Sequence, residues 1–75
     1  MEKGIVKFFN TEKGFGFICM ENQPDIFVHL NDILDNPKIL LDGQHVEFEI
    51  GVGARGPKAK NVKVVPLIEK ENDGN

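Results

Sequence analysis

The chain has 75 residues, 40% of them hydrophobic, and a formal net charge of −3. This length predicts a single domain, close to the lower limit at which one hydrophobic core keeps a chain folded. A single cysteine excludes an internal disulfide, and no apolar run has the length of a membrane span or the pattern of a signal peptide. We therefore expect a reducing, cytoplasmic setting and no membrane partner.

The charges are distributed unevenly along the chain. Residues 69–75 contain three acidic residues and one lysine, a net charge of −2, which leaves −1 for residues 1–68. We therefore predict a domain over residues 1–68 and an acidic, flexible tail over residues 69–75. Within the domain, Lys7 and Lys13 flank the aromatic strands, and a second group of basic residues consists of Arg55, Lys58, Lys60 and Lys63.

The first half of the chain predicts three strands. Residues 4–10 are rich in strand formers and precede a turn, and a second strand runs from this turn to about residue 20. The third strand covers residues 25–30, with Pro24 just before it because proline cannot donate a ladder hydrogen bond. Adjacent Phe8 and Phe9 cannot share a face of a regular strand, and alternation alone does not decide which of them points inward.

The second half predicts a short helical turn within residues 31–38 and then two more strands. Residues 45–50 alternate polar and apolar, which predicts a strand with Val46, Phe48 and Ile50 inward. A flexible glycine-rich loop is expected over residues 51–57. It precedes a fifth strand over residues 58–65 that buries Val62 and Val64. Five short strands in so small a chain favour an all-β fold, a closed or nearly closed barrel without exposed sheet edges.

Two aromatic segments indicate the function. In Lys13-Gly14-Phe15-Gly16-Phe17-Ile18, strand alternation places both phenylalanines on one face, and in Asp25-Ile26-Phe27-Val28-His29-Leu30 it places Phe27 with His29. The opposite faces carry Ile18, Ile26 and Val28, which suffice to line a core. The aromatic layer is therefore surplus to folding. A flat aromatic surface beside lysine is typical of proteins that stack the bases of single-stranded nucleic acid.

The first of these segments also matches the start of the RNP1 pattern of RNA-binding modules. Together with Gly4-Ile5-Val6-Lys7-Phe8-Phe9-Asn10 and Gly56-Pro57-Lys58-Ala59-Lys60-Asn61-Val62, it makes residues 2–65 closely resemble a bacterial cold-shock protein. That resemblance implies a five-stranded antiparallel OB-fold barrel that binds single-stranded RNA and DNA, with Phe8 pointing outward. It places these residues at nucleic-acid-contacting positions: Lys7, Phe8, Lys13, Phe15, Phe17, Phe27, His29 and Arg55.

The chain departs from the family at three stacking positions. Phe8 stands where tryptophan is usual, Leu30 where an aromatic residue is usual, and Pro37-Lys38 where the long loop usually offers phenylalanine. We keep Leu30 and Lys38 in the predicted interface, together with the basic Lys58 and Lys60. Because each stacked base contributes about 1–3 kcal/mol, these departures predict a weaker binder with a shorter footprint than a typical member.

Other functions have weaker support. Residues 51–56 fit the G-x-G-x-x-G dinucleotide fingerprint, but no βαβ unit surrounds them. His29, His45 and Cys19 lack metal-ligand spacing, Cys19 is interpreted as an unreactive strand residue, and no set of catalytic residues stands out. We therefore expect no enzyme, no cofactor, no metal and no small-molecule substrate. The alternative function is a small β-barrel protein-interaction module.

The expected function is single-stranded RNA and DNA binding with low sequence specificity. We expect a monomeric RNA chaperone that acts in transcription or translation regulation, with cold adaptation as its setting. The few basic residues near the aromatic layer predict a shallow salt dependence, on the order of two to four released counterions.

Overall fold

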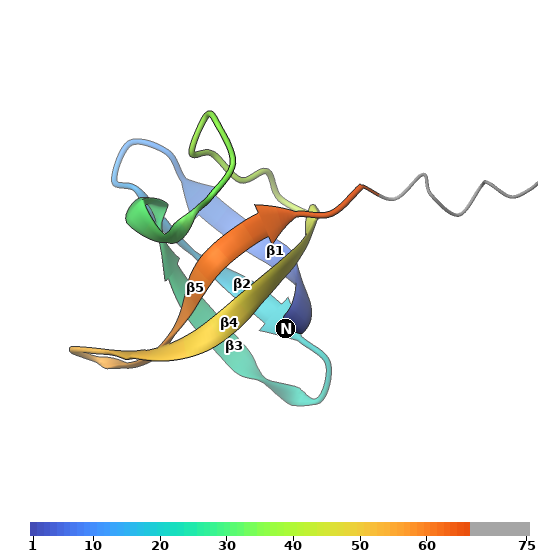
Figure 1. Ribbon diagram of the computed structural model, residues 1–75, viewed down its shortest axis with the longest axis vertical. Helices are drawn as coiled ribbons and strands as arrows, with labels where there is room; N and C mark the ends of the chain where they lie inside the picture. The colour runs from blue at the N-terminus through green and yellow to red at the C-terminus, as the bar shows by residue number, and fades with distance from the viewer. Residues whose placement is uncertain (67–75) are drawn as a thin grey trace, which may run out of the picture.

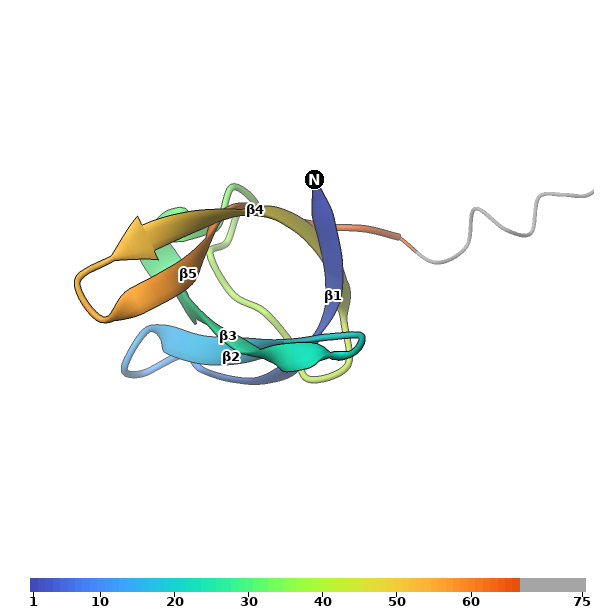
Figure 2. The same ribbon diagram turned by 90° about the horizontal axis from the view of Figure 1, so that it is seen from below.

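The computed structural model describes residues 1–66, which form a five-stranded barrel with a single 3-10 turn (Figure 1). The elements are β1 (Glu2–Asn10), β2 (Phe15–Met20), β3 (Gln23–His29), η1 (Leu30–Asp32), β4 (His45–Gly53) and β5 (Gly56–Val64). The strands follow one another around the barrel in the order β1-β2-β3-β5-β4 and enclose one interior (Figure 2). Neighbouring strands are antiparallel except β3 and β5, which meet in parallel at Phe27 and Lys58. The predicted barrel is confirmed.

The core is made from one face of each strand and from two residues of the long connection. Ile18, Ile26 and Val28 are buried, as the alternation predicted, and Phe48 is fully buried. Val62 is buried too, and Val64 packs against the core as a half-buried residue. The complete buried set is Val6, Ile18, Ile26, Val28, Ile33, Leu40, Val46, Phe48, Ala59 and Val62. Phe48 is thus the single phenylalanine of the buried core, which leaves the aromatic rings of β2 and β3 outside it.

A bulge in β1 decides which of the two adjacent phenylalanines faces outward. In the pairing of β1 with β2, Val6 lies opposite Ile18 and Phe8 lies opposite Phe17, so Lys7 is the extra residue. Val6 is buried, whereas both Lys7 and Phe8 are exposed, and Phe9 packs against the core. The extra residue resets the alternation, so Phe8 faces outward, as the family resemblance implied.

The segment predicted as a flexible loop, residues 51–57, is instead a β-hairpin. β4 continues to Gly53, β5 begins at Gly56, and the two strands are joined by a two-residue turn. Gly56 has a φ of +118°, a conformation that glycine adopts readily and other residues rarely adopt. This conformation allows the two strands to be joined by so short a turn. The glycines that suggested a loop therefore serve the hairpin, which extends beyond the barrel in Figures 1 and 2.

The inward position predicted for Ile50 is wrong, because its side chain is 48% exposed. β1 pairs with β4 only as far as Phe48, where Glu2 is its partner. Beyond Phe48, β4 pairs with β5 alone as part of the projecting hairpin, and the side chain of Ile50 is left partly open to solvent. Val46 and Phe48 lie before this point and are buried as predicted.

The boundaries of β3 and of the helical turn also differ from the prediction. β3 begins at Gln23 after a turn that holds Asn22 at a φ of +59°, so Pro24 lies inside the strand rather than before it. Pro24 is tolerated there because β5 pairs with β3 only farther along, at Phe27. The helical turn begins at Leu30, one residue earlier than predicted. Within residues 1–66, no helix is long and apolar enough to cross a membrane, and the predicted tail lies outside the described residues.

Candidate nucleic-acid interface

Four phenylalanine rings from three adjacent strands form one surface, the aromatic platform, made of Phe8, Phe15, Phe17 and Phe27. The strand register brings them together, since Phe8 lies opposite Phe17 and Phe17 opposite Phe27. The Phe8 and Phe17 ring centroids are 5.7 Å apart, and those of Phe17 and Phe27 are 5.9 Å apart in an edge-to-face arrangement. Phe15 and Phe27 are nearly parallel, with centroids 6.1 Å apart and an interplanar angle of 23°. These contacts fix the rings relative to one another.

The platform rings remain accessible. Phe8 is 39% exposed, and Phe15, Phe17 and Phe27 are half-buried. Gly16 lies between Phe15 and Phe17 and sits against the Phe8 carbonyl, so no side chain fits there and β1 and β2 approach closely. The platform thus exposes aromatic surface on a backbone that is held tightly by its neighbours.

A groove of about 700 Å³ runs between the platform and the β4–β5 hairpin. Phe15, Phe17, Phe27 and His29 form one wall. The other wall consists of Gly53, Ala54, Arg55, Gly56, Pro57 and Lys58. Figure 2 shows the hairpin projecting sideways from the barrel, near the end of the sheet where β2 begins. Sequence reasoning predicted Arg55 and Lys58 here but missed the backbone of the hairpin, because the segment was predicted to be a flexible loop.

His29 ends β3 and has a fixed ring orientation. Its Nδ1 accepts a hydrogen bond from the backbone N–H of Asn31 at 3.1 Å, which caps the first turn of η1. In the neutral ring the proton is therefore carried by Nε2, which serves as a hydrogen-bond donor. His29 lies opposite Phe15 in the β2–β3 pairing and lines the groove.

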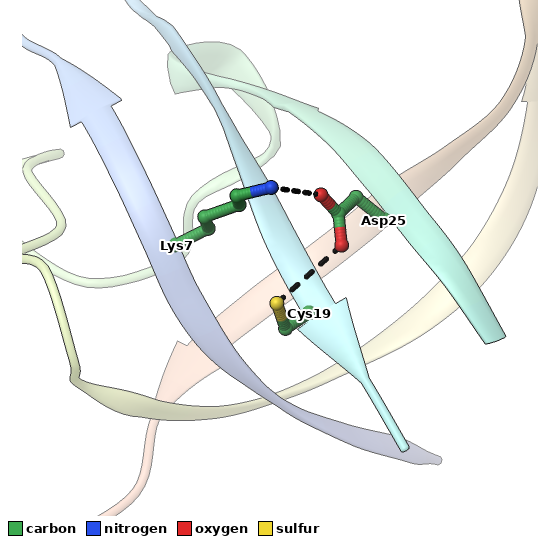
Figure 3. A network of polar contacts seen from close by, with 3 residues as sticks. All are labelled: Lys7, Cys19 and Asp25. Atoms are coloured by element: carbon green, nitrogen blue, oxygen red, sulfur yellow. Dashed lines mark hydrogen bonds and ion pairs between the residues drawn. The ribbon is translucent and has the colours of Figure 1, made fainter. Parts of the chain in front are cut away.

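Lys7 belongs to a polar network that crosses β1, β2 and β3 (Figure 3). Its Nζ lies 2.8 Å from Asp25 Oδ2, and Asp25 Oδ1 accepts a hydrogen bond from Cys19 Sγ at 3.4 Å. The hydrogen bond to Asp25 and the carboxylate charge raise the pKa of Lys7, and the hydrogen bonds from Lys7 and then from Cys19 lower the pKa of Asp25. Sequence reasoning missed Asp25, which is 18 residues from Lys7 along the chain.

The pKa of the Cys19 thiol is raised, mainly by its hydrogen bond to Asp25 and then by burial. A raised pKa keeps the thiol protonated and slow to react. This agrees with the interpretation of Cys19 as an unreactive strand residue.

Lys58 forms the second ion pair near the platform. Its Nζ lies 3.2 Å from Asp32 Oδ2. The Asp32 carboxylate at the end of η1 thus lies next to Lys58 of the groove wall. Arg55, in contrast, is exposed at the tip of the hairpin.

The remaining predicted residues do not line the groove. Lys38 Nζ donates a hydrogen bond to the Ile33 carbonyl at 2.9 Å. The side chain of Lys60 lies over Gly51. Lys13 is exposed in the β1–β2 turn, and Leu30 packs over Gly14 and against the core.

Neither rival motif gains support from the part of the chain that the structure describes. Residues 51–56 lie in the hairpin and continue into β5 rather than into the helix that a dinucleotide site needs. Residues 1–66 contain no group of three histidine, cysteine or acidic side chains placed to hold a metal ion.

Comparison with known proteins places the sequence among close relatives. The model of the family described as the 'Cold-shock' DNA-binding domain matches residues 2–65. The chain is 56% identical over 63 residues to the cold shock protein CspA of Staphylococcus haemolyticus and to that of Staphylococcus aureus, which covers 83% of this chain and 96% of each relative. The Drosophila structure Unr CSD456 superposes with a TM-score of 0.73 at 25% identity, over 99% of this chain and 29% of that longer one.

Proposed function

The chain belongs to the cold-shock domain family, whose barrel binds nucleic acid, and from this we propose that it captures single-stranded RNA and DNA on the aromatic platform with low sequence specificity. One observation supports the proposal above all. Four aromatic rings remain accessible beside a groove, although the core is complete without them. Bases stack on such rings whatever their identity, because every base has an aromatic face.

The groove supports a preference for single strands. One wall carries phenylalanine rings, and the opposite wall contains Arg55 of the hairpin. An unpaired strand presents bases to the rings and phosphates to the cation, whereas a duplex keeps its bases stacked inside. A protein that traps unpaired bases in this way, without energy input and without catalysis, opposes RNA secondary structure. We therefore propose that it acts as an RNA chaperone.

The cellular role that we propose follows from this activity. A monomer in the cytoplasm that keeps transcripts single-stranded affects their transcription or translation. Such an effect is needed most in the cold, where base pairing is more stable. No covalent chemistry is required, so the proposed mechanism needs no cofactor.

We propose weak binding. Phe8 supplies a smaller ring than the tryptophan usual in the family, Leu30 packs against the core, and the Lys38 ammonium is held by a backbone carbonyl. The loss of one stacked base, about 1–3 kcal/mol, lowers affinity roughly fivefold or more. Fluorescence anisotropy with labelled oligo-dT at physiological salt tests this, and a nanomolar dissociation constant would contradict it.

The second candidate is a protein-interaction module that presents the same platform to another protein. Exposed aromatic surface suits either partner. A backbone NMR titration with a single-stranded oligonucleotide separates the two, with Phe17→Ala as the test variant and Val52→Ala as the control. Val52 is 89% exposed on β4 and is absent from the groove walls, so its removal should leave binding intact.

Phe17→Ala should abolish most of the chemical-shift changes that the oligonucleotide induces, while the spectrum of the free variant remains that of a folded protein. Unchanged shifts in a folded Phe17→Ala variant would refute binding on the platform, and the absence of shifts in the wild type would favour the protein-interaction module.

A further inference from the structure

The two ion pairs beside the platform differ in their access to water. In the Lys7–Asp25 pair the side chains are 56% and 33% exposed, and the ammonium and carboxylate are hydrogen-bonded. In the Lys58–Asp32 pair they are only 32% and 17% exposed. Asp32 Oδ2 is sealed from solvent and has no hydrogen-bond partner among the described residues. Lys58 at 3.2 Å is the cation that compensates this oxygen.

Asp32 and Lys58 face each other across the most sparsely paired seam of the barrel. β3 and β5 share one ladder pair, Phe27 with Lys58, and the chain after η1 is fixed to β5 by a bridge between Ile33 and Val62. The N–H of Leu34 also donates to the Val62 carbonyl at 2.8 Å. The backbone therefore fixes Asp32 close to Lys58, and the ion pair does not depend on a mobile loop.

A phosphate in the groove competes with Asp32 for the Lys58 ammonium. The free-energy cost of not binding Lys58 differs between the phosphate and Asp32. A phosphate near the groove surface remains hydrated and screened by salt. Asp32 Oδ2 has neither water nor another donor, so departure of Lys58 would leave an uncompensated charge in a partly buried site. Lys58 is therefore expected to stay paired with Asp32 when a phosphate enters the groove.

We propose that Asp32 is a positioning residue that withholds the charge of Lys58 from the phosphate backbone. Lys58 then shapes the groove wall, and Arg55 is the cation of that wall that contacts phosphate. This inference rests on the proposed function. Asp32 thus limits the number of phosphate contacts and keeps binding dependent on stacking. The exposed Asp25 remains hydrated when Lys7 leaves it, so the same restraint does not apply to Lys7.

The salt dependence of oligo-dT binding tests the proposal, because log K falls as log salt rises and each phosphate contact in a single strand adds about 0.7 to the magnitude of that negative slope. The slope named below is this magnitude. Arg55→Gln should lower the slope by about 0.7. Lys58→Gln removes the same charge from the same groove and should leave the slope almost unchanged. A loss in Lys58→Gln equal to that in Arg55→Gln would overturn the proposal.

The reverse experiment frees Lys58. Asp32→Asn should raise the slope by about 0.7 and tighten binding at low salt, and the double variant Asp32→Asn/Lys58→Gln should return to the wild-type slope. Asp42→Asn, an exposed site with the same charge change, controls for net charge and should have a smaller effect. An unchanged slope in Asp32→Asn, or a raised slope that persists in the double variant, would contradict the proposal.

The outcomes separate this inference from the proposed function. If the wild type does not bind oligo-dT, the proposed function fails. If the wild type binds and Arg55→Gln lowers the slope as expected, the results for the Asp32 and Lys58 variants test only the proposed role of Asp32. Thermal unfolding verifies that each variant is folded, and if Asp32→Asn is not, the comparison of Lys58→Gln with Arg55→Gln still decides.

Discussion

The thiol of Cys19 donates a hydrogen bond to Asp25 Oδ1 at 3.4 Å, while the other oxygen of the same carboxylate binds Lys7 (Figure 3). One aspartate on β3 therefore determines the ionisation of a neighbour on β1 and of a neighbour on β2. Hydrogen bonds to its carboxylate, reinforced by the negative charge, favour the charged form of the lysine and the neutral form of the thiol, which explains why both pKa values are raised.

Asp25→Asn should make Cys19 more reactive. Because the pKa of the thiol is raised above its ordinary value, the reactive thiolate forms only at higher pH than in an ordinary cysteine. The substitution removes the carboxylate and leaves the Lys7 ammonium nearby, so the pKa should fall and alkylation at pH 8 should accelerate. Rates of iodoacetamide labelling measured by mass spectrometry from pH 7 to 10 give the shift. Identical pH profiles for Asp25→Asn and the control Asp42→Asn would contradict this prediction.

Phe8→Trp should tighten binding to single-stranded nucleic acid. Phe8 is 39% exposed and touches Phe15 and Phe17, so a larger ring at this position extends the platform without entering the core. Phe8→Ala should weaken binding by about 1–3 kcal/mol, which is roughly fivefold or more. Since the sequence has no tryptophan, Phe8→Trp also supplies a fluorophore that stacked bases quench. If titration of Phe8→Trp with an oligonucleotide gives neither quenching of the tryptophan fluorescence nor a gain in affinity, bases do not stack at position 8.

The exposure of Ile50 predicts a contrast between two apolar residues of β4. Ile50→Thr should change the free energy of unfolding by no more than about 0.5 kcal/mol, as is usual at exposed positions. Val46 is 1% exposed, and Val46→Ala removes two buried methyl groups, which should cost about 2 kcal/mol. Urea unfolding measures both. A larger loss for Ile50→Thr than for Val46→Ala would mean that β4 buries Ile50 after all.

Gly16→Ala should destabilise the barrel more than Gly53→Ala. A Cβ at Gly16 would collide with the Phe8 carbonyl and the Phe9 backbone, which cannot move without opening the β1–β2 pairing. At Gly53 the nearest atom is the flexible Lys58 Cδ at 3.1 Å. We expect a loss of more than about 2 kcal/mol at Gly16 and less than about 1 kcal/mol at Gly53, measured by urea unfolding. Equal losses would show that the close approach of β1 and β2 is relaxed in solution.

The sequence predicts features that depend on local alternation and misses those that depend on pairing between distant residues. Period-two alternation places Phe15 and Phe17 outward and Ile18 inward, because that pattern belongs to any extended strand. The bulge at Lys7 and the end of the β1–β4 ladder at Phe48 arise from the closure of the barrel, which no local window contains.

The ion pairs illustrate the same limit at the site. Lys58 was predicted as a phosphate contact from its charge alone, and its partner Asp32 lies 26 positions earlier. Only the meeting of η1 with β5 brings the two together. The family resemblance and the charge pattern therefore predict which basic residues belong to the candidate site, whereas the ion pairs that engage each charge follow from the fold.

Removal of residues 69–75 should strengthen binding at low salt. These residues carry a net charge of −2, and their loss changes the chain from −3 to −1, which weakens the repulsion of phosphate. The segment lies outside the described residues, and the described chain leaves the barrel at residue 66 on the side away from the hairpin (Figure 1). We therefore expect a long-range effect of roughly two- to fivefold at low ionic strength. It should vanish near 1 M salt, where charges are screened within about 3 Å. A full-length control with Glu69, Glu71 and Asp73 changed to Gln, Gln and Asn should reproduce the gain, and anisotropy that shows no gain at low salt in either variant would rule out the tail as a competitor of phosphate.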